Sequence, residues 1–214
     1  QHRGLFHLEA CLDLYALIRL SLQCCGLWKR AVRNYLDIQV EANEVPLEGL
    51  PAAFDGYRIL QLTALHADLH PDFPAAVLYA LDGLAYDLAV VTGDFRTSTF
   101  GDASGATKAS LQILSGLQAP VYAVLGNHDS LNKLPPLEAA GVRFLLNENV
   151  PIERDGQRFH LVGIDDPNFY KTHDFDHALQ GVPEDACKLL LSHSPEGFAE
   201  ADARGFGLLL AGHT

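Results

Sequence analysis

The sequence has no methionine, a single tryptophan and only four cysteines among its 214 residues. Because position 1 is glutamine, we expect a chain that is processed, trimmed or recorded without modified methionines. The cysteines lack the paired spacing of a zinc site or a disulfide framework: Cys11, Cys24, Cys25 and Cys187. Their pattern therefore predicts reduced thiols and a cytoplasmic location.

Basic residues are also scarce. Lysine and arginine together number 15 against 27 acidic residues, so the formal net charge is −12. A nucleic-acid-binding protein needs a basic patch to neutralise phosphates, and we therefore predict no nucleic-acid partner. Phosphate binding itself stays open, because bound metal ions reverse the local charge. An apolar content of 48% and a charged content of 20% are typical of a folded globular chain.

The sequence contains no hydrophobic run that is long and uncharged enough to predict a membrane span. The most apolar stretch, residues 5–25, has helical periodicity, but it contains three charged residues and no secretory cleavage pattern. It is followed by Trp28 and the basic residues Lys29, Arg30 and Arg33. This combination is typical of an interfacial membrane anchor. A helix that packs on the domain or on a second subunit fits the same pattern.

The change in pattern after this stretch predicts two parts. Residues 1–35 form an apolar and amphipathic helical segment, and residues 36–214 form the main domain. If residues 5–33 contact lipid, the protein is peripheral at the inner face of the membrane.

Strand and helix patterns alternate through the main domain. Helical periodicity is predicted at residues 73–81, 106–117, 136–140 and 174–179. Apolar runs on either side of Asp155 and Gly156 predict a hairpin around residues 150–162. Alternating residues at 36–41 predict a half-exposed strand. The alternation as a whole predicts an α/β domain.

Five apolar runs of strand length lead into residues that can bind a metal or a phosphate. The residues that follow these runs are His66, Asp94, Asn127, His193 and His213. Because α/β sheets place their chemistry at the C-terminal ends of parallel strands, we expect these side chains to converge. Oxygen and nitrogen ligands without a thiolate suit Mn, Fe or Zn at a hydrolytic centre.

The order of these motifs resembles that of the calcineurin-like metallophosphoesterases. The resemblance covers residues 57–214 and is carried by Gly-Asp at 93–94, Gly-Asn-His-Asp at 126–129, the lone His193 and Gly-His at 212–213. The stretches 126–130, 163–167 and 192–195 are similar to a bacterial branch that is often associated with membranes. The resemblance implies a four-layer αββα sandwich of two mixed β-sheets, with two divalent metal ions (Mn, Fe or Zn) at one rim.

The resemblance also implies a role for each residue. Asp94 matches the carboxylate that bridges the two metals, and His66 matches a ligand of the first metal. The further ligands of the second metal match Asn127, His193 and His213. His128 matches the residue that protonates the leaving oxygen or stabilises its charge. Asp129 would orient His128 through a hydrogen bond to the ring N–H.

One expected ligand of the first metal is absent. The aspartate of the family falls on Ala64, whereas Asp68 and His70 repeat the same motif too far beyond the strand. Ala64 is either natural divergence or an introduced substitution. Because the chain ends at Thr214, where the last histidine of the family would follow, we expect missing C-terminal sequence. This chain is therefore predicted to bind one metal firmly and to be impaired in catalysis.

The resemblance implies metal-dependent hydrolysis of a phosphoester at a dinuclear centre. The predicted partner is a phosphorylated small molecule or a lipid. At a membrane surface, the substrate would be a lipid-linked or nucleotide-lipid pyrophosphate, of the UDP-diacylglucosamine type. A small soluble phosphodiester is the competing substrate. Because Ala64 removes an expected ligand, a different class of function is also considered: a non-catalytic scaffold of the same fold that binds metal.

Overall fold

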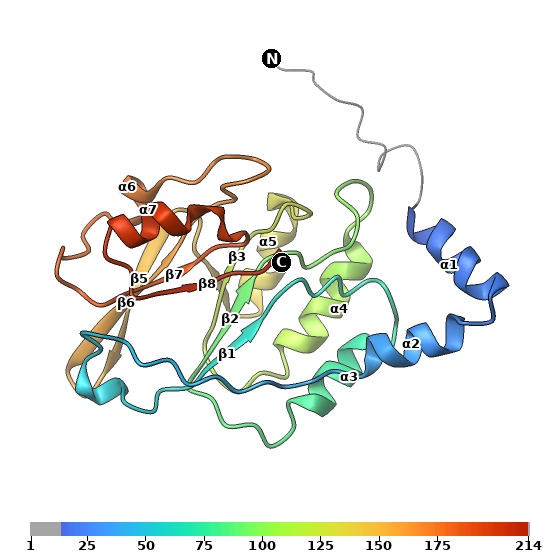
Figure 1. Cartoon of the computed structure of the whole chain (residues 1–214), viewed down its shortest axis with the longest axis horizontal. Helices are drawn as coiled ribbons and strands as arrows, with labels where there is room; N and C mark the ends of the chain where they lie inside the picture. Colours follow the sequence, from blue (N-terminus) through green and yellow to red (C-terminus); the bar gives the residue numbers. More distant parts are fainter. Residues whose placement is uncertain (1–13, 214) are drawn as a thin grey trace, which may run out of the picture. The chain divides into compact units, whose positions relative to one another are not determined.

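The computed structural model describes residues 14–213, which fall into two units that divide after Val40 (Figure 1). The first unit contains helices α1 (Leu14–Cys24) and α2 (Trp28–Leu36). Gly26, with a φ of +68°, makes the turn between them. The predicted helix at residues 5–25 is seen from residue 14 onward, and its earlier residues lie outside the described part of the chain.

The first unit exposes apolar side chains on α1. Leu17, Ile18 and Leu20 are each between 48% and 57% exposed. The guanidinium carbon of Arg19 lies 5.2 Å from the centroid of the Trp28 ring. Within residues 14–213, none of the helices has the length and hydropathy that a membrane crossing requires.

The strand predicted at residues 36–41 is wrong. Leu36 ends α2, and residues 37–41 have no regular secondary structure. An alternating pattern becomes a strand only when a neighbouring strand supplies hydrogen-bond partners. Among the strands that the structure describes, none pairs with this segment.

The second unit contains two four-stranded sheets. In the first sheet every neighbouring pair is parallel, in the order β1 (Ile59–Leu62), β2 (Leu88–Thr92), β3 (Val121–Val124) and β4 (Val142–Phe144). The second sheet has the order β5 (Glu148–Arg154), β6 (Gln157–Gly163), β7 (Lys188–Leu191) and β8 (Leu208–Leu210). Here β5 is antiparallel to β6, and the other pairs are parallel. The predicted hairpin is confirmed, with Asp155 and Gly156 at φ values of +50° and +73°.

Helices flank both sheets (Figure 1). On the side of the first sheet lie α3 (Phe73–Ala80), α4 (Ser104–Leu114) and α5 (Leu134–Ala139). The second sheet is flanked by α6 (Phe175–Ala178) and α7 (Phe198–Ala203). Short 3₁₀ turns occur at Ala52–Phe54, Leu131–Lys133 and Pro195–Gly197. The four predicted helices of this unit are confirmed with small shifts at their ends, whereas α7 is an addition to the prediction.

Apolar residues on both faces of the strands produce the layers. On β7, Leu189 and Leu191 join the cluster between the sheets, whereas Leu190 packs in the cluster that includes α6 and α7. Leu161 and Val162 divide in the same way on β6. Strands that are covered on both faces need such continuous apolar runs. The predicted αββα sandwich is therefore confirmed, with a parallel first sheet and a mixed second sheet.

Candidate metal centre

The candidate site lies where parallel strands of both sheets end. The loops that follow β1, β2 and β3 leave the same edge of the first sheet, because these strands pair in parallel. The loops that follow β7 and β8 leave the second sheet in the same way. The two edges meet, since the Gln61 side-chain amide donates a hydrogen bond of 2.9 Å to the carbonyl of Ala211.

Four residues at this edge adopt a left-handed backbone conformation. The φ values are +46° for Ala64, +40° for His66, +56° for Asp94 and +56° for His213. Residues with a Cβ rarely adopt this conformation, because the Cβ comes close to the following carbonyl oxygen. Such conformations persist where the surrounding structure imposes them, and they concentrate at functional sites. All four positions coincide with the ligand positions predicted from the sequence.

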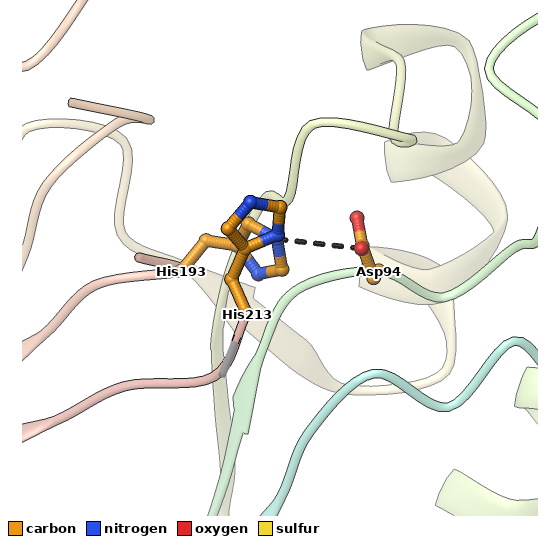
Figure 2. A group of neighbouring side chains, drawn as sticks. All are labelled: Asp94, His193 and His213. Carbon is orange, nitrogen blue, oxygen red and sulfur yellow. Dashed lines mark ion pairs between the residues drawn. The ribbon is translucent and has the colours of Figure 1, made fainter. Parts of the chain in front are cut away.

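Three of the predicted ligands form a compact cluster (Figure 2). Potential ligand atoms of Asp94, His193 and His213 all lie within 4.8 Å of one another. The Nε2 atom of His193 is 3.3 Å from Oδ2 of Asp94, and the two imidazole centroids are 4.9 Å apart. Asp94 and His193 are buried, whereas His213 is exposed. The cluster therefore combines a deep anionic ligand with one imidazole that is open to solvent.

The hydrogen bonds of His193 show that this cluster fits a cation. Its Nδ1 atom donates to the carbonyl of Thr92 at 2.8 Å, which leaves a lone pair on Nε2 in the neutral ring. Nε2 faces Oδ2 of Asp94 and, at 2.9 Å, Oδ1 of Asn127. Three acceptors that converge in a buried place require a proton or a metal ion between them. A second-sphere carbonyl that fixes the imidazole in this way is the usual support for a metal ligand.

The pKa values of the pair agree with this interpretation. Burial works against charge on both side chains, and it alone would raise the pKa of Asp94 and lower that of His193. Their mutual hydrogen bond and charge attraction outweigh burial. The pKa of Asp94 is lowered and that of His193 is raised relative to their ordinary values. Without a metal, the site thus stabilises a proton in the place where a metal ion would bind.

The structure places the residues of the two possible registers of the first metal motif differently. His66 reaches the centre, with Nε2 at 3.9 Å from Oδ2 of Asp94 and Nδ1 at 2.9 Å from the carbonyl of Arg96. His70 instead contacts Asp72, through the backbone N–H of Asp72. Asp68 accepts hydrogen bonds from the backbone and hydroxyl of Thr97. His66, rather than His70, therefore lies beside Asp94, and the assignment of ligands to this register stays a prediction.

His128 lies at the edge of the cluster. Its backbone N–H donates to Oδ1 of Asp94 at 3.0 Å, and its ring is 5.6 Å from that of His66 between centroids. The Nδ1 atom is 2.9 Å from the hydroxyl oxygen of Thr99. The ring is half-buried, so it is accessible to a group that binds beside the cluster.

Asp129 has backbone partners beyond the His128 ring that the resemblance implies. Its carboxylate accepts hydrogen bonds from the backbone N–H groups of Asp94, Phe95 and Gly126, at 2.8, 3.1 and 2.9 Å respectively. The contacts of His128 include the hydrogen bond from its backbone N–H to Asp94 and the contact of its ring with Thr99. Because Asp129 ties the loop after β2 to the loop after β3, we assign it a positioning role.

Replacing Asp129 by alanine is expected to destabilise the second unit by about 3 kcal/mol, because it leaves three buried N–H groups unpaired. Asp129→Asn keeps one acceptor oxygen and should cost about 1 kcal/mol. Urea unfolding in the presence of EDTA measures both values without a contribution from bound metal. Equal stability of the alanine and asparagine variants would contradict this assignment.

Three further residues at the site are not among the predicted catalytic and metal-binding residues. Arg96 is buried and donates from Nε to the carbonyl of His128 at 2.9 Å. The hydroxyl of Tyr170 donates to the carbonyl of Asn127 at 3.2 Å, from the loop before α6. Thr99 contacts the ring of His128, as described above. Arg96 and Thr99 closely follow the Gly-Asp motif in the sequence. Charged and hydroxyl residues after a strand usually belong to a surface loop, so their position did not predict a role at the site.

Comparison with known proteins gives the family. Residues 57–214 match the family model described as calcineurin-like phosphoesterase. The chain belongs to the calcineurin-like phosphoesterase family. Metal-dependent phosphoester hydrolysis is the activity of this family, and it implies divalent metal ions. The carboxylate, imidazole and amide groups of Asp94, His193, His213 and Asn127 fit such ions.

Two curated proteins are similar to the chain. "Uncharacterized protein YpbG" of Bacillus subtilis (strain 168) is 28% identical over 132 residues, which cover 59% of this chain and 50% of that protein. "Transmembrane protein with metallophosphoesterase domain" of Danio rerio is 28% identical over 191 residues, which cover 80% of this chain and 43% of that protein. The chain thus spans about half the length of these relatives.

A crystal structure of the protein of unknown function AQ665 from Aquifex aeolicus also matches. The TM-score is 0.41 and the identity 20%, with 72% of this chain and 89% of that chain covered.

Proposed function

We propose that this chain hydrolyses phosphoesters with divalent metal ions held at the ends of β2, β3, β7 and β8. One metal would be bound by Asp94, Asn127, His193 and His213. The observation that carries the proposal is Nε2 of His193, which faces two oxygen acceptors in a buried place while Nδ1 is committed to a carbonyl. A second metal would share Asp94 and be bound by His66.

The residues of the site divide the work of hydrolysis. Bound divalent metals would supply a water of lowered pKa and would neutralise charge on the phosphate oxygens. In the reaction, a water oxygen forms the new bond to phosphorus and the bond from phosphorus to the leaving oxygen breaks. His128 gives a proton to that leaving oxygen. Because Nδ1 is engaged by Thr99, Nε2 is the atom that would carry this proton.

Ala64 weakens the first of the two metal positions. Its methyl group offers no ligand atom, so His66 and Asp94 alone would hold that metal among the residues described. We therefore propose that this chain binds one metal firmly and is impaired relative to a chain with aspartate at position 64.

The hydrolysis proposal is tested with bis(4-nitrophenyl) phosphate and the purified chain. We expect release of 4-nitrophenol with Mn²⁺, and at least about a tenfold loss of rate when EDTA removes the metal. Restoring excess Mn²⁺ should restore the rate. A rate that does not depend on metal would contradict the proposal.

We propose that the substrate lies at a membrane surface and is a lipid-linked or nucleotide-lipid pyrophosphate, of the UDP-diacylglucosamine type. Support comes from α1, which exposes Leu17, Ile18 and Leu20, and from the basic residues of α2. The name of the Danio rerio relative, which calls that protein transmembrane, and the resemblance to a bacterial membrane-associated branch point in the same direction. The protein would then be peripheral at the inner face of the membrane, with residues 5–33 in contact with lipid.

Vesicle sedimentation tests this membrane contact. We expect the chain to pellet with vesicles that contain phosphatidylglycerol, and the double change Arg30→Gln and Arg33→Gln to lower the partition coefficient about 30-fold. The matched control changes Arg143 and Arg158 to glutamine, which alters the net charge equally on exposed strand positions. If both double variants pellet like the original chain, the membrane proposal is wrong, and a small soluble phosphodiester becomes the substrate to test.

Ala64 favours a second candidate, a non-catalytic scaffold that uses the fold to bind metal and hold a partner. The two candidates differ in one measurement. A scaffold would bind Mn²⁺ at the cluster of Asp94, His193 and His213 and show no hydrolysis even with aspartate at position 64.

A further inference from the structure

A cavity of about 710 Å³ includes Arg96, whose side chain bonds the backbone of His128 at the edge of the candidate metal centre. It is lined by the segment 96–104 that leads into α4, by α4 itself, and by residues near Ser130 and Pro136. This volume lies within the range of cavities that hold small ligands, about 300–1,000 Å³. None of its lining residues is among the predicted metal ligands, so the cavity extends the site rather than repeating it.

Arg96 connects the cavity to the centre and is 4% exposed. Its guanidinium donates from Nε to the carbonyl of His128 and from Nη1 to the carbonyl of Gly101. In the part of the chain that the structure describes, no carboxylate forms an ion pair with it. A buried cation that has only neutral partners is costly, and an anion that enters beside it would relieve that cost.

The other walls of the cavity also suit an anion. Lys108 projects from α4 as a second cation, and Ser130 and Asn132 add hydrogen-bond donors. The one acidic residue of the lining, Asp102, is engaged, because it accepts hydrogen bonds from the backbone and hydroxyl of Ser104. In a chain with a net charge of −12, two cations in one cavity mark an unusual local environment.

The cavity lies on the His128 side of the metal centre. Arg96 bonds the backbone carbonyl of His128, and Thr99, from the same segment, contacts its ring at 2.9 Å. Since His128 is the residue assigned to the leaving oxygen, a leaving group bound there would extend toward Arg96. This placement rests on the proposed function.

We propose that this cavity is the leaving-group pocket, and that it selects phosphoesters whose leaving group carries a second anionic group. The second anion would lie between Arg96 and Lys108, and Leu111 and Pro136 would contact the carbon skeleton. Substrates of this class include pyrophosphates and esters of carboxylate-bearing or phosphate-bearing alcohols. Neutral leaving groups would leave Arg96 without an anion and bind less tightly.

The test uses three phosphonates that cannot be hydrolysed. Phenylphosphonate has one anionic group, and 3- and 4-phosphonobenzoate add a carboxylate at two different distances from it. Calorimetric titration of the Mn²⁺-loaded chain should show that the better of the two phosphonobenzoates binds about tenfold more tightly than phenylphosphonate. Lys108→Gln should reduce this preference to below about threefold. The matched control, Arg158→Gln at an exposed position of β6, should keep the full preference.

Two further results bear on the proposal. Arg96→Lys keeps the charge but loses the planar fork, and it should also reduce the preference for the second anion. If that variant does not fold, Lys108→Gln on the exposed face of α4 still decides the question. Equal affinity for all three phosphonates would overturn the proposal. Because the titration needs no turnover, a carboxylate preference without hydrolysis would support an anion pocket and count against the hydrolytic function alone.

Discussion

Replacing Ala64 by aspartate is expected to raise the Mn²⁺-dependent rate on bis(4-nitrophenyl) phosphate by about 100-fold. Position 64 follows β1 at the edge where Asp94 and His66 lie, and its backbone N–H already bonds the carbonyl of Gly93 at 3.1 Å. A carboxylate there would add a ligand to a metal position for which the described residues offer His66 and the shared Asp94. Two metal ions stabilise both the attacking and the leaving oxygen in the transition state of phosphoryl transfer, whereas a single metal ion stabilises this transition state less.

Ala64→Asn is the matched control for this experiment. Asparagine and aspartate both tolerate the left-handed conformation that Ala64 adopts, at a φ of +46°. Comparing the two variants therefore separates the effect of the carboxylate charge from the effect of a lower backbone strain. We expect the asparagine variant to gain less than about tenfold. Elemental analysis of dialysed protein should show a rise from one Mn to two in the aspartate variant only. Equal rates and equal metal content in all three versions would show that position 64 is not a ligand position.

Removing the shared carboxylate is expected to have the opposite effect. In the Ala64→Asp background, Asp94→Asn should lower the hydrolysis rate by about 1,000-fold and the Mn²⁺ affinity by at least about 100-fold. Asp94 supplies the only anionic side chain in the described cluster with His193 and His213. Asparagine keeps nearly the same shape and one oxygen. The expected loss therefore follows from the missing negative charge, which in Asp94 attracts the metal ions.

Asp68→Asn tests whether this loss is specific. Asp68 belongs to the alternative motif beyond the strand, and its carboxylate is bonded to Thr97 rather than to the centre. The variant should keep metal content and rate within about twofold, with a small loss of stability. A loss at Asp68 as large as that at Asp94 would mean that the alternative register contributes the ligands.

Local sequence patterns predicted most of this architecture, for physical reasons. The spacing of apolar residues indicates whether a segment buries one face as a helix or both faces as a strand. Predictions made from this spacing are confirmed for β1–β3, β7, β8 and four helices. Asp155 and Gly156 predicted the β5–β6 turn because both residues tolerate a positive φ. The segment 36–41 failed because alternation alone cannot supply a partner strand.

The roles of individual side chains were less accessible to sequence reasoning. Asp129 was expected to orient His128, and nothing in the sequence indicated that it also accepts hydrogen bonds from Asp94 and Phe95, 35 and 34 residues earlier in the chain. His193 is held by the carbonyl of Thr92, 101 residues away. Neither partner follows from local spacing.

The sequence by itself determined the α/β class and the order of the motifs, because both depend on local periodicity and on small polar residues that follow apolar runs. It also located Ala64 as an unusual residue among the expected ligands. The tertiary structure placed His66, rather than His70, beside Asp94, and it showed the buried cation Arg96 in a cavity and bonded to the backbone of His128. These features depend on contacts between loops that follow different strands of the first sheet, and such long-range contacts leave no periodic signal in the chain.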